Sequence, residues 1–234
     1  LNKQKGGHIV ILKKITSLLI LASSLFVMTV NASPMSQGLN VQAELKQFSE
    51  RAPGLNPKVL QLGLEAYNKA RQEGLDNQQI LTIVDYTKPS TVRRLWVLDL
   101  KNNSVLFNDY VAHGKNSGGN YANSFSDKPG SLESSLGVFL TESPYQGKHG
   151  YSLKLKGLEK GFNDRAEARD IVVHKADYVT TQFLRQHGSL GRSWGCFAVS
   201  PAVADSLIHV IKNGTLIFAY YPDPMWLSKS QFLS

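Results

Sequence analysis

The chain has 234 residues, of which 42% are hydrophobic and 19% are charged, and its formal net charge is +8. This length is sufficient for one globular domain with a hydrophobic core. No arginine-rich run and no basic patch interleaved with aromatic residues occurs, so the composition argues against nucleic acid as a partner. The mild positive charge would suit an anionic polymer of the cell envelope, but it equally fits an ordinary solvated surface.

The N-terminal residues have the pattern of a secretory signal peptide. Four lysines between positions 3 and 14 precede an uncharged apolar run from Ile15 to Val30, and Asn31-Ala32 follows. The run is shorter than the roughly 20 residues that span a bilayer, so an uncleaved anchor is the less favoured alternative. We therefore predict a signal peptide over residues 1–32, no stable membrane span after its cleavage, and a secreted or periplasmic protein of the cell envelope.

Two helices are predicted next. Residues 41–50 can form a short helix that Pro53-Gly54 ends. Asn56-Pro57 is typical of an N-cap followed by proline at the first helical position, and Gly74 is a suitable C-terminal stop. We assign residues 33–89 to a helical N-terminal extension that packs beside the catalytic fold.

From residue 80 onward the sequence favours strands. Branched apolar residues predict a hairpin with its turn at residues 101–103 and, in all, strands over residues 80–86, 94–100, 104–111, 137–141, 152–155, 171–174 and 215–221. A helix is predicted from the N-cap Ser200-Pro201 through Lys212. Many strands with few helices indicate a mainly β, largely antiparallel domain with helical additions, which we place at residues 90–234.

A long polar, glycine-rich tract runs from His113 to Tyr151. Loops of this length in a compact domain are usually functional or mobile. We interpret the tract as a wall that faces the substrate, and disorder is the alternative.

Cys196 is the only cysteine in the chain. In an exported protein, an unpaired cysteine indicates a reactive thiol or an intermolecular disulfide, whereas a buried packing role is the alternative. A nearby cation or helix N-terminus lowers a thiol pKa, and Arg192 or the helix predicted after Ser200 could supply one. Gly191 and Gly195 would let the backbone approach a ligand closely, so that amide N–H groups point at a developing oxyanion.

A thiol nucleophile needs a base within hydrogen-bond distance. His174 ends the predicted strand 171–174, and a side chain on a regular element is held more firmly than one on a loop. His174 is therefore our preferred general base. The other candidates are His113, His149, His187 and His209.

The stretch from His174 to Pro201 resembles the catalytic domain of the murein L,D-transpeptidases, the YkuD-like fold. The signature of that family is a histidine, a spacer and then Ser-x-Gly-Cys, which here is His174 followed by Ser193-Trp194-Gly195-Cys196. The resemblance covers residues 90–221 and matches a divergent branch of the family, with upstream similarity at residues 112–114, 129–131, 134–137 and 147–150. It implies a β-sandwich or barrel-like catalytic domain.

The resemblance also implies a mechanism. His174 would take the proton of Cys196, and the thiolate would attack the carbonyl that precedes a terminal D-alanine in a peptidoglycan stem peptide. The thioester would then be resolved by an amine, giving a cross-link, or by water, giving carboxypeptidase activity. The implied catalytic residues are Cys196, His174, Ser193 and Gly195, and the implied substrate-binding residues are His149, Tyr151, Arg192 and Trp194.

The resemblance implies that a backbone carbonyl near Ser193 orients the ring of His174. Asp170 and Asp177 are the alternative groups for this role. No metal or cofactor is implied, and the chain has no CxxC or HExxH pattern. Two positions depart from the family: Lys175, where glycine is usual, and Ala198, where asparagine or arginine is usual.

Three other functions stay open at this point. One is another envelope cysteine peptidase or amidase that uses the same pair of residues. The second is a noncatalytic cell-wall-binding domain with a decayed site, and the third is a redox or intermolecular disulfide role for Cys196. The sequence does not indicate the oligomeric state.

Overall fold

The computed structural model describes residues 38–76 and 78–233. The signal peptide predicted at residues 1–32 lies outside these described residues. Among the helices of the described part, none has both the length and the apolar character that a bilayer crossing requires.

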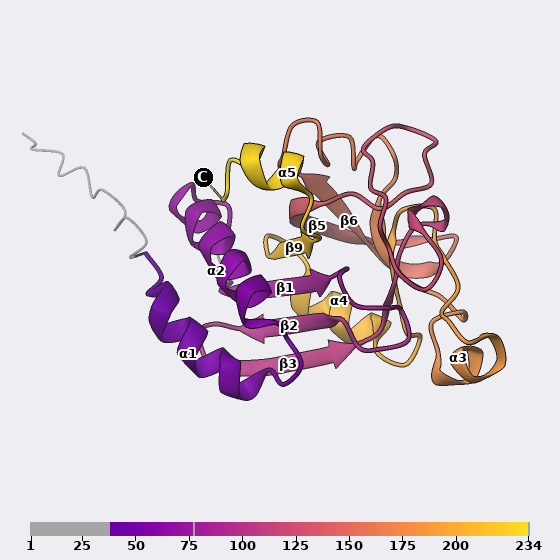
Figure 1. The fold of residues 1–234 in the computed structure, drawn as a ribbon, viewed down its shortest axis with the longest axis horizontal. Coiled ribbons are helices and arrows are strands. Elements are labelled where there is room, and N and C mark those ends of the chain that lie inside the picture. The colour runs from indigo at the N-terminus through magenta and orange to yellow at the C-terminus, as the bar shows by residue number, and fades with distance from the viewer. Residues whose placement is uncertain (1–37, 77, 234) are drawn as a thin grey trace, which may run out of the picture. The chain divides into compact units, whose positions relative to one another are not determined.

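The described residues form a mainly β fold with one nine-stranded sheet in the order β3-β2-β1-β9-β5-β6-β7-β8-β4 (Figure 1). The strands are β1 Ile80–Asp85, β2 Leu95–Asp99, β3 Ser104–Asp109, β4 Val111–Ala112, β5 Gly137–Gly147, β6 Gly150–Gly157, β7 Val172–Lys175, β8 Phe197–Val199 and β9 Leu216–Tyr220. Six of the neighbouring pairs are antiparallel, whereas β1 pairs with β9 and β7 pairs with β8 in parallel. The predicted mainly β fold class is thus confirmed.

Five α-helices and one short 3-10 helix accompany the sheet in the described residues. They are α1 Val41–Arg51, α2 Pro57–Gln72, α3 Thr181–His187, α4 Ala204–Ile211, α5 Pro224–Lys229 and the 3-10 helix η1 Lys115–Ser117. As predicted, the Asn56 side chain accepts a hydrogen bond from the Lys58 N–H and Pro57 takes the first helical position of α2. Helix α2 therefore begins where its capping residues indicate, and α1 forms over Val41–Arg51, close to the predicted range 41–50.

Helix α2 packs its apolar face on the sheet next to β1, and α1 lies beside β3 (Figure 1). A β-carbon added at Gly63 of α2 would lie 3.0 Å from Cδ1 of Ile83 and 3.2 Å from Cδ1 of Phe218, so the small residue permits close helix–sheet packing. One large cluster of buried side chains includes residues of α2, β1 and β9. The predicted boundary between residues 89 and 90 remains a prediction, and β1 on its N-terminal side is an inner strand of the sheet.

A second, smaller apolar cluster lies beside the C-terminal strands. It consists of Ala112, Ala176, Val179, Leu190 and Ala198. These residues come from β4, β8 and the segments that follow β7 and α3. The cluster closes the end of the sheet that carries the predicted catalytic stretch.

Three features of the site region differ from the prediction. Strand β8 occupies residues that were not predicted to form a strand, and it pairs in parallel with β7. Helix α4 begins at Ala204 and not after Ser200, because residues 200–203 form a turn in which the Ser200 carbonyl accepts from the N–H groups of Val203 and Ala204. Strands β5 and β6 are longer than predicted, so the end of the glycine-rich tract is a β-hairpin and not a loop.

Candidate active site

The parallel pair β7–β8 brings the two halves of the predicted catalytic motif together. Val173 is the register partner of Phe197, and His174 is the partner of Ala198. Side chains of paired residues point to the same face of a sheet, and faces alternate along a strand. His174 and Ala198 therefore share one face, and Cys196 directly precedes β8 and packs partly against the main core. The pairing thus brings the segment that carries the thiol beside the strand that carries His174.

The sulfur of Cys196 lies in a partly buried environment beside the start of β7. Its thiol donates a hydrogen bond of 3.5 Å to the carbonyl of Asp170. Burial raises the pKa of the Cys196 thiol, and the Asp170 carboxylate raises it further, while the Val172 N–H and the Arg169 guanidinium lower it. The net effect is a raised pKa, so a resting thiol needs a base before it can attack.

His174 is buried, with 3% of its surface exposed, and Nδ1 lies 2.9 Å from the carbonyl oxygen of Lys175. A carbonyl can only accept, so Nδ1 carries the proton and Nε2 is left as the basic nitrogen. The prediction that a group at Ser193, Asp170 or Asp177 orients this ring is wrong, because the next carbonyl along the chain already holds it. Burial lowers the pKa of His174, the bond to Lys175 raises it, and His149 lowers it.

His149 stands at the tip of the β5–β6 hairpin and stacks on His174. The two ring centroids are 4.4 Å apart and the rings are inclined by 30°. The His149 side chain is exposed, and its stacked ring shields one side of the His174 ring from solvent. Its predicted role in substrate binding remains a prediction.

Ser193 shapes the loop that carries Cys196. Its hydroxyl donates to the Cys196 carbonyl at 2.7 Å and accepts from the Gly195 N–H at 3.1 Å. Its backbone N–H donates to the His113 carbonyl, and its own carbonyl accepts from the Lys115 N–H. These bonds fix the loop against the segment after β4.

The two glycines of the motif permit close approach to the protein itself. Gly195 has a φ of +118°, and a β-carbon there would lie 2.7 Å from the Glu133 carbonyl oxygen. A β-carbon at Gly191 would lie 2.5 Å from Cβ of Tyr178. The sequence indicated that small residues were needed, but the groups that they approach are Glu133 and Tyr178.

The remaining predicted substrate-binding residues are spread around the site. Trp194 is 73% exposed and borders a pocket of ≈ 270 Å³ that Arg169 and Asp170 also line. Tyr151 lies on β6 and packs partly against the main core. Arg192 extends toward the Gly118 carbonyl at 3.4 Å, so the guanidinium that lowers the Cys196 pKa belongs to Arg169 instead.

A second pocket lies on the His149 side of the site. It measures ≈ 420 Å³ and is lined by Lys148, His149, Gly150, Lys175, Ala176, Asp177 and Tyr178. Burial and, to a smaller extent, the neighbouring Cys196 raise the pKa of Tyr178 to about 12. Tyr178 was not singled out from the sequence, and with this raised pKa it lines the pocket as a neutral phenol at pH 7.

His113, another candidate base, is a structural residue. It is 1% exposed, and Nδ1 lies 2.7 Å from Nη2 of the buried Arg94. Burial and the Arg94 charge lower the pKa of His113 to about 4. No group of three or more histidine, cysteine, aspartate or glutamate residues is placed to hold a metal ion in the part of the chain that the structure describes.

Comparison with known proteins identifies the family. The YkuD_2 family model, described as the L,D-transpeptidase catalytic domain, matches residues 51–220. No match was found among curated protein sequences.

Solved structures of L,D-transpeptidases are also similar at low identity. One from Mycobacterium smegmatis is 15% identical with a TM-score of 0.38, covering 61% of this chain and 59% of its own. One from Stackebrandtia nassauensis is 14% identical with a TM-score of 0.37, covering 77% of each chain, and one from Xylanimonas cellulosilytica is 16% identical with a TM-score of 0.35, covering 78% and 94%. The chain thus spans about three fifths of the length of the first of these. The family match extends over more than half of the sequence, and the chain belongs to the L,D-transpeptidase catalytic domain family.

Proposed function

We propose that the protein is a cysteine acyltransferase that acts on peptidoglycan stem peptides, as an L,D-transpeptidase or an L,D-carboxypeptidase. Cys196 is the nucleophile and His174 is the general base. The observation that supports the proposal is the parallel pairing of β7 with β8, in which Cys196 directly precedes the strand that lies beside His174, while the Lys175 carbonyl holds Nδ1 of His174. That arrangement leaves Nε2 free to accept the thiol proton.

The two pKa directions suit these roles. The pKa of Cys196 is raised, so the thiol keeps its proton at neutral pH, whereas the pKa of His174 is lowered, so the imidazole is neutral and able to accept. General-base assistance of this kind contributes about 100-fold to 10,000-fold in rate. The proton therefore passes from Cys196 to His174 during the attack, and the two residues do not form an ion pair beforehand.

The reaction then follows in two acyl transfers. The Cys196 sulfur bonds to the carbonyl carbon that precedes the terminal D-alanine, and the proton passes to His174. The Cys196 N–H supports the developing oxyanion, since the Gly195 N–H is already bound by Ser193. D-alanine leaves with the proton, and an amine of a second stem peptide or water attacks the thioester and regenerates the thiol.

The proposal also places the protein in the cell envelope. Cleavage of the signal peptide at residues 1–32 would release a chain whose helical extension, residues 33–89, precedes the catalytic part, residues 90–234. His149, Tyr151, Arg192 and Trp194 would contact the stem peptide, and two of them, His149 and Trp194, line pockets beside the site.

The test is product analysis with a purified murein tetrapeptide. Free D-alanine with a dimer means transpeptidation, and D-alanine with a tripeptide means hydrolysis. Cys196→Ser should abolish both, whereas Ser228→Ala, a change at an exposed serine of α5, should leave both intact. Full turnover by Cys196→Ser would refute the nucleophile assignment.

Mass spectrometry after incubation with a carbapenem provides an independent readout. A covalent adduct on Cys196 is expected from an acyl-transfer site. A folded protein with an unmodified thiol and no product would instead indicate the noncatalytic wall-binding function.

A further inference from the structure

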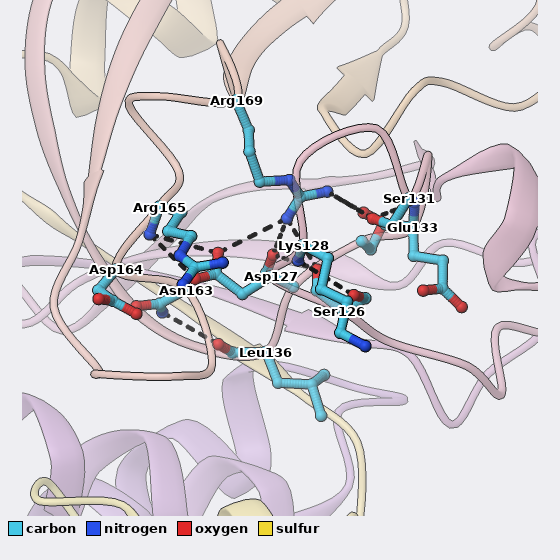
Figure 2. Close-up of polar contacts among 12 residues, drawn as sticks. Ser126, Asp127, Lys128, Ser131, Glu133, Leu136, Asn163, Asp164, Arg165 and Arg169 are labelled. Carbon is cyan, nitrogen blue, oxygen red and sulfur yellow. Dashed lines mark hydrogen bonds and ion pairs between the residues drawn. The ribbon is translucent and has the colours of Figure 1, made fainter.

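Arg169 places a buried guanidinium beside the catalytic loop, and sequence reasoning did not single it out. Its side chain is 3% exposed. Nη1 donates to the Ser126 carbonyl at 2.7 Å and to the Ser135 hydroxyl at 2.6 Å, and Nη2 donates to the Glu133 carbonyl at 2.7 Å (Figure 2). Nη2 also donates to the Ser131 hydroxyl at 3.2 Å. The guanidinium therefore ties the 126–135 loop to the segment before β7.

The segment 169–172 touches the Gly195–Cys196 loop at several points. A β-carbon at Gly195 would lie 3.1 Å from Nη2 of Arg169. Asp170 has a φ of +53°, and in this left-handed conformation its carbonyl accepts the Cys196 thiol at 3.5 Å. The Val172 N–H also faces the sulfur. Arg169 is thus held against the backbone of the residue that precedes the nucleophile.

The charge of Arg169 is only partly balanced by its partners. Four of its hydrogen bonds go to neutral oxygens, and the one carboxylate paired with it, Asp127, lies 3.7 Å from Nη1. Burial lowers the pKa of Arg169, but an arginine remains charged at neutral pH. An unbalanced buried cation stabilises a nearby anion more strongly than an exposed one does.

Other titratable groups also face the thiol. The Asp170 carboxylate disfavours the thiolate, His174 lies on the neighbouring strand β7, and Tyr86 and Tyr178 are both neutral at pH 7 because burial raises the pKa of each to about 12. The charge of Glu133 raises the pKa of Arg169. None of these groups offers a permanent positive charge.

We propose that Arg169 is a positioning residue for the reaction, whose guanidinium stabilises the Cys196 thiolate from beneath the Gly195–Cys196 loop. The inference rests on the proposed function, in which Cys196 is the nucleophile. It assigns to Arg169 an electrostatic role beyond its scaffold role in the 126–135 loop. The electrostatic role can be tested separately from the scaffold role. Removing the Arg169 cation should raise the pKa of the Cys196 thiol, whereas removing the Asp127 counter-charge should lower it.

The experiment is the pH–rate profile of Cys196 alkylation by iodoacetamide on the full chain. In this reaction the thiolate forms a carbon–sulfur bond and iodide leaves, so the rate follows the thiolate fraction without any stem peptide. Arg169→Gln should slow alkylation at pH 7 about tenfold, which corresponds to a pKa rise of about one unit. Arg169→Lys keeps the charge and should stay within about threefold of the wild type.

The Asp127→Asn variant should change the alkylation rate in the direction opposite to Arg169→Gln, and this difference decides the test. It is close to isosteric and keeps an oxygen for the Arg165 N–H, but it removes the counter-charge of Arg169. Alkylation at pH 7 should become about threefold faster, with a lower midpoint in the profile. Arg165→Gln, an exposed arginine in the same segment, is the matched control and should leave the profile unchanged.

The outcomes separate cleanly. A slower Arg169→Gln and a faster Asp127→Asn support the proposal, and if Arg169→Gln does not fold, the direction seen in Asp127→Asn decides. An unchanged or slower Asp127→Asn overturns the proposal, as does an Arg169→Lys variant that is as slow as Arg169→Gln. Because alkylation does not depend on turnover, failure of the proposed acyltransferase would appear in the murein assay and leave this result readable.

Discussion

Gly195→Ala should destabilise the protein far more than an alanine at an ordinary turn glycine. With a φ of +118°, an alanine at this position pays a backbone cost of about 1 to 2 kcal/mol. Its β-carbon would also lie 2.7 Å from the Glu133 carbonyl oxygen, closer than such contacts allow. That oxygen accepts a hydrogen bond of 2.7 Å from Arg169. If the Glu133 oxygen moves away, it strains this hydrogen bond to a charged donor, and such a bond contributes about 1.5 to 3 kcal/mol. The expected loss is about 3 to 5 kcal/mol.

The matched control is Gly54→Ala, in the turn between α1 and α2. Gly54 has a φ of +83°, and an added β-carbon would meet nothing within 4 Å, so this variant pays the backbone cost alone. In thermal unfolding followed by circular dichroism, Gly195→Ala should lower Tm by about 10 °C and Gly54→Ala by about 3 to 6 °C. Equal effects of the two substitutions would show that the approach of Glu133 to Gly195 does not constrain the loop.

Three further predictions concern the catalytic pair and its loop. His174→Ala should reduce the rate of Cys196 acylation by a carbapenem at least about 10-fold at pH 7 with the fold intact, whereas the same loss in His149→Ala would show that His149 is the base. Burial and the adjacent His149 lower the pKa of His174, so the acid limb of the pH profile of acylation should have its midpoint below 6.5. His149→Ala should move that midpoint upward, and an unmoved or lower midpoint would contradict the stacked geometry. Ser193→Ala breaks the two bonds that shape the Cys196 loop and should cost about 1 to 3 kcal/mol in urea unfolding, against about 0.5 kcal/mol or less for the exposed Ser228→Ala.

Elements with a strong local signature were predictable from the sequence. The cap at Asn56-Pro57 determines where α2 begins, and α2 forms as predicted. The turn at residues 101–103 joins β2 and β3 in the predicted hairpin, with Asn103 at a φ of +52°. In each case a few adjacent residues contain the physical cause, which is a satisfied N–H group or a favoured left-handed turn residue.

The pairing of strands could not be predicted in the same way. Two strands separated by 21 residues, β7 and β8, run in parallel because a crossover containing α3 connects them, and the sequence pattern did not predict β8 as a strand. Parallel strands begin at the same end of a sheet, so residues 169–171 and 195–196 meet there. Arg169 was missed for this reason: its proximity to Cys196 follows from the pairing and from no local pattern.

The local conformation of the glycine-rich tract was equally hidden. A β-carbon at Gly114 would lie 2.5 Å from the Leu132 carbonyl oxygen, and Leu132 itself has a φ of +58°. These contacts join segments that are 18 residues apart in the sequence. The prediction of a wall that faces the substrate gave no indication of them. The tract is packed onto the site by Arg169 and Ser134, since the Ser134 hydroxyl accepts from the Gly114 N–H at 3.0 Å.

The two departures from the family pattern become understandable once these contacts are known. Ala198 is fully buried between β4 and β7 in the small apolar cluster, where a larger polar side chain would have to be desolvated without room for a partner. Lys175 contributes through its backbone, since its carbonyl holds Nδ1 of His174. Its side chain runs along the hairpin tip, with Cε 2.9 Å from where a β-carbon of Gly150 would be. The small side chain at 198 therefore follows from its burial in this cluster, and the side chain of Lys175 is accommodated beside Gly150 while its carbonyl orients the imidazole.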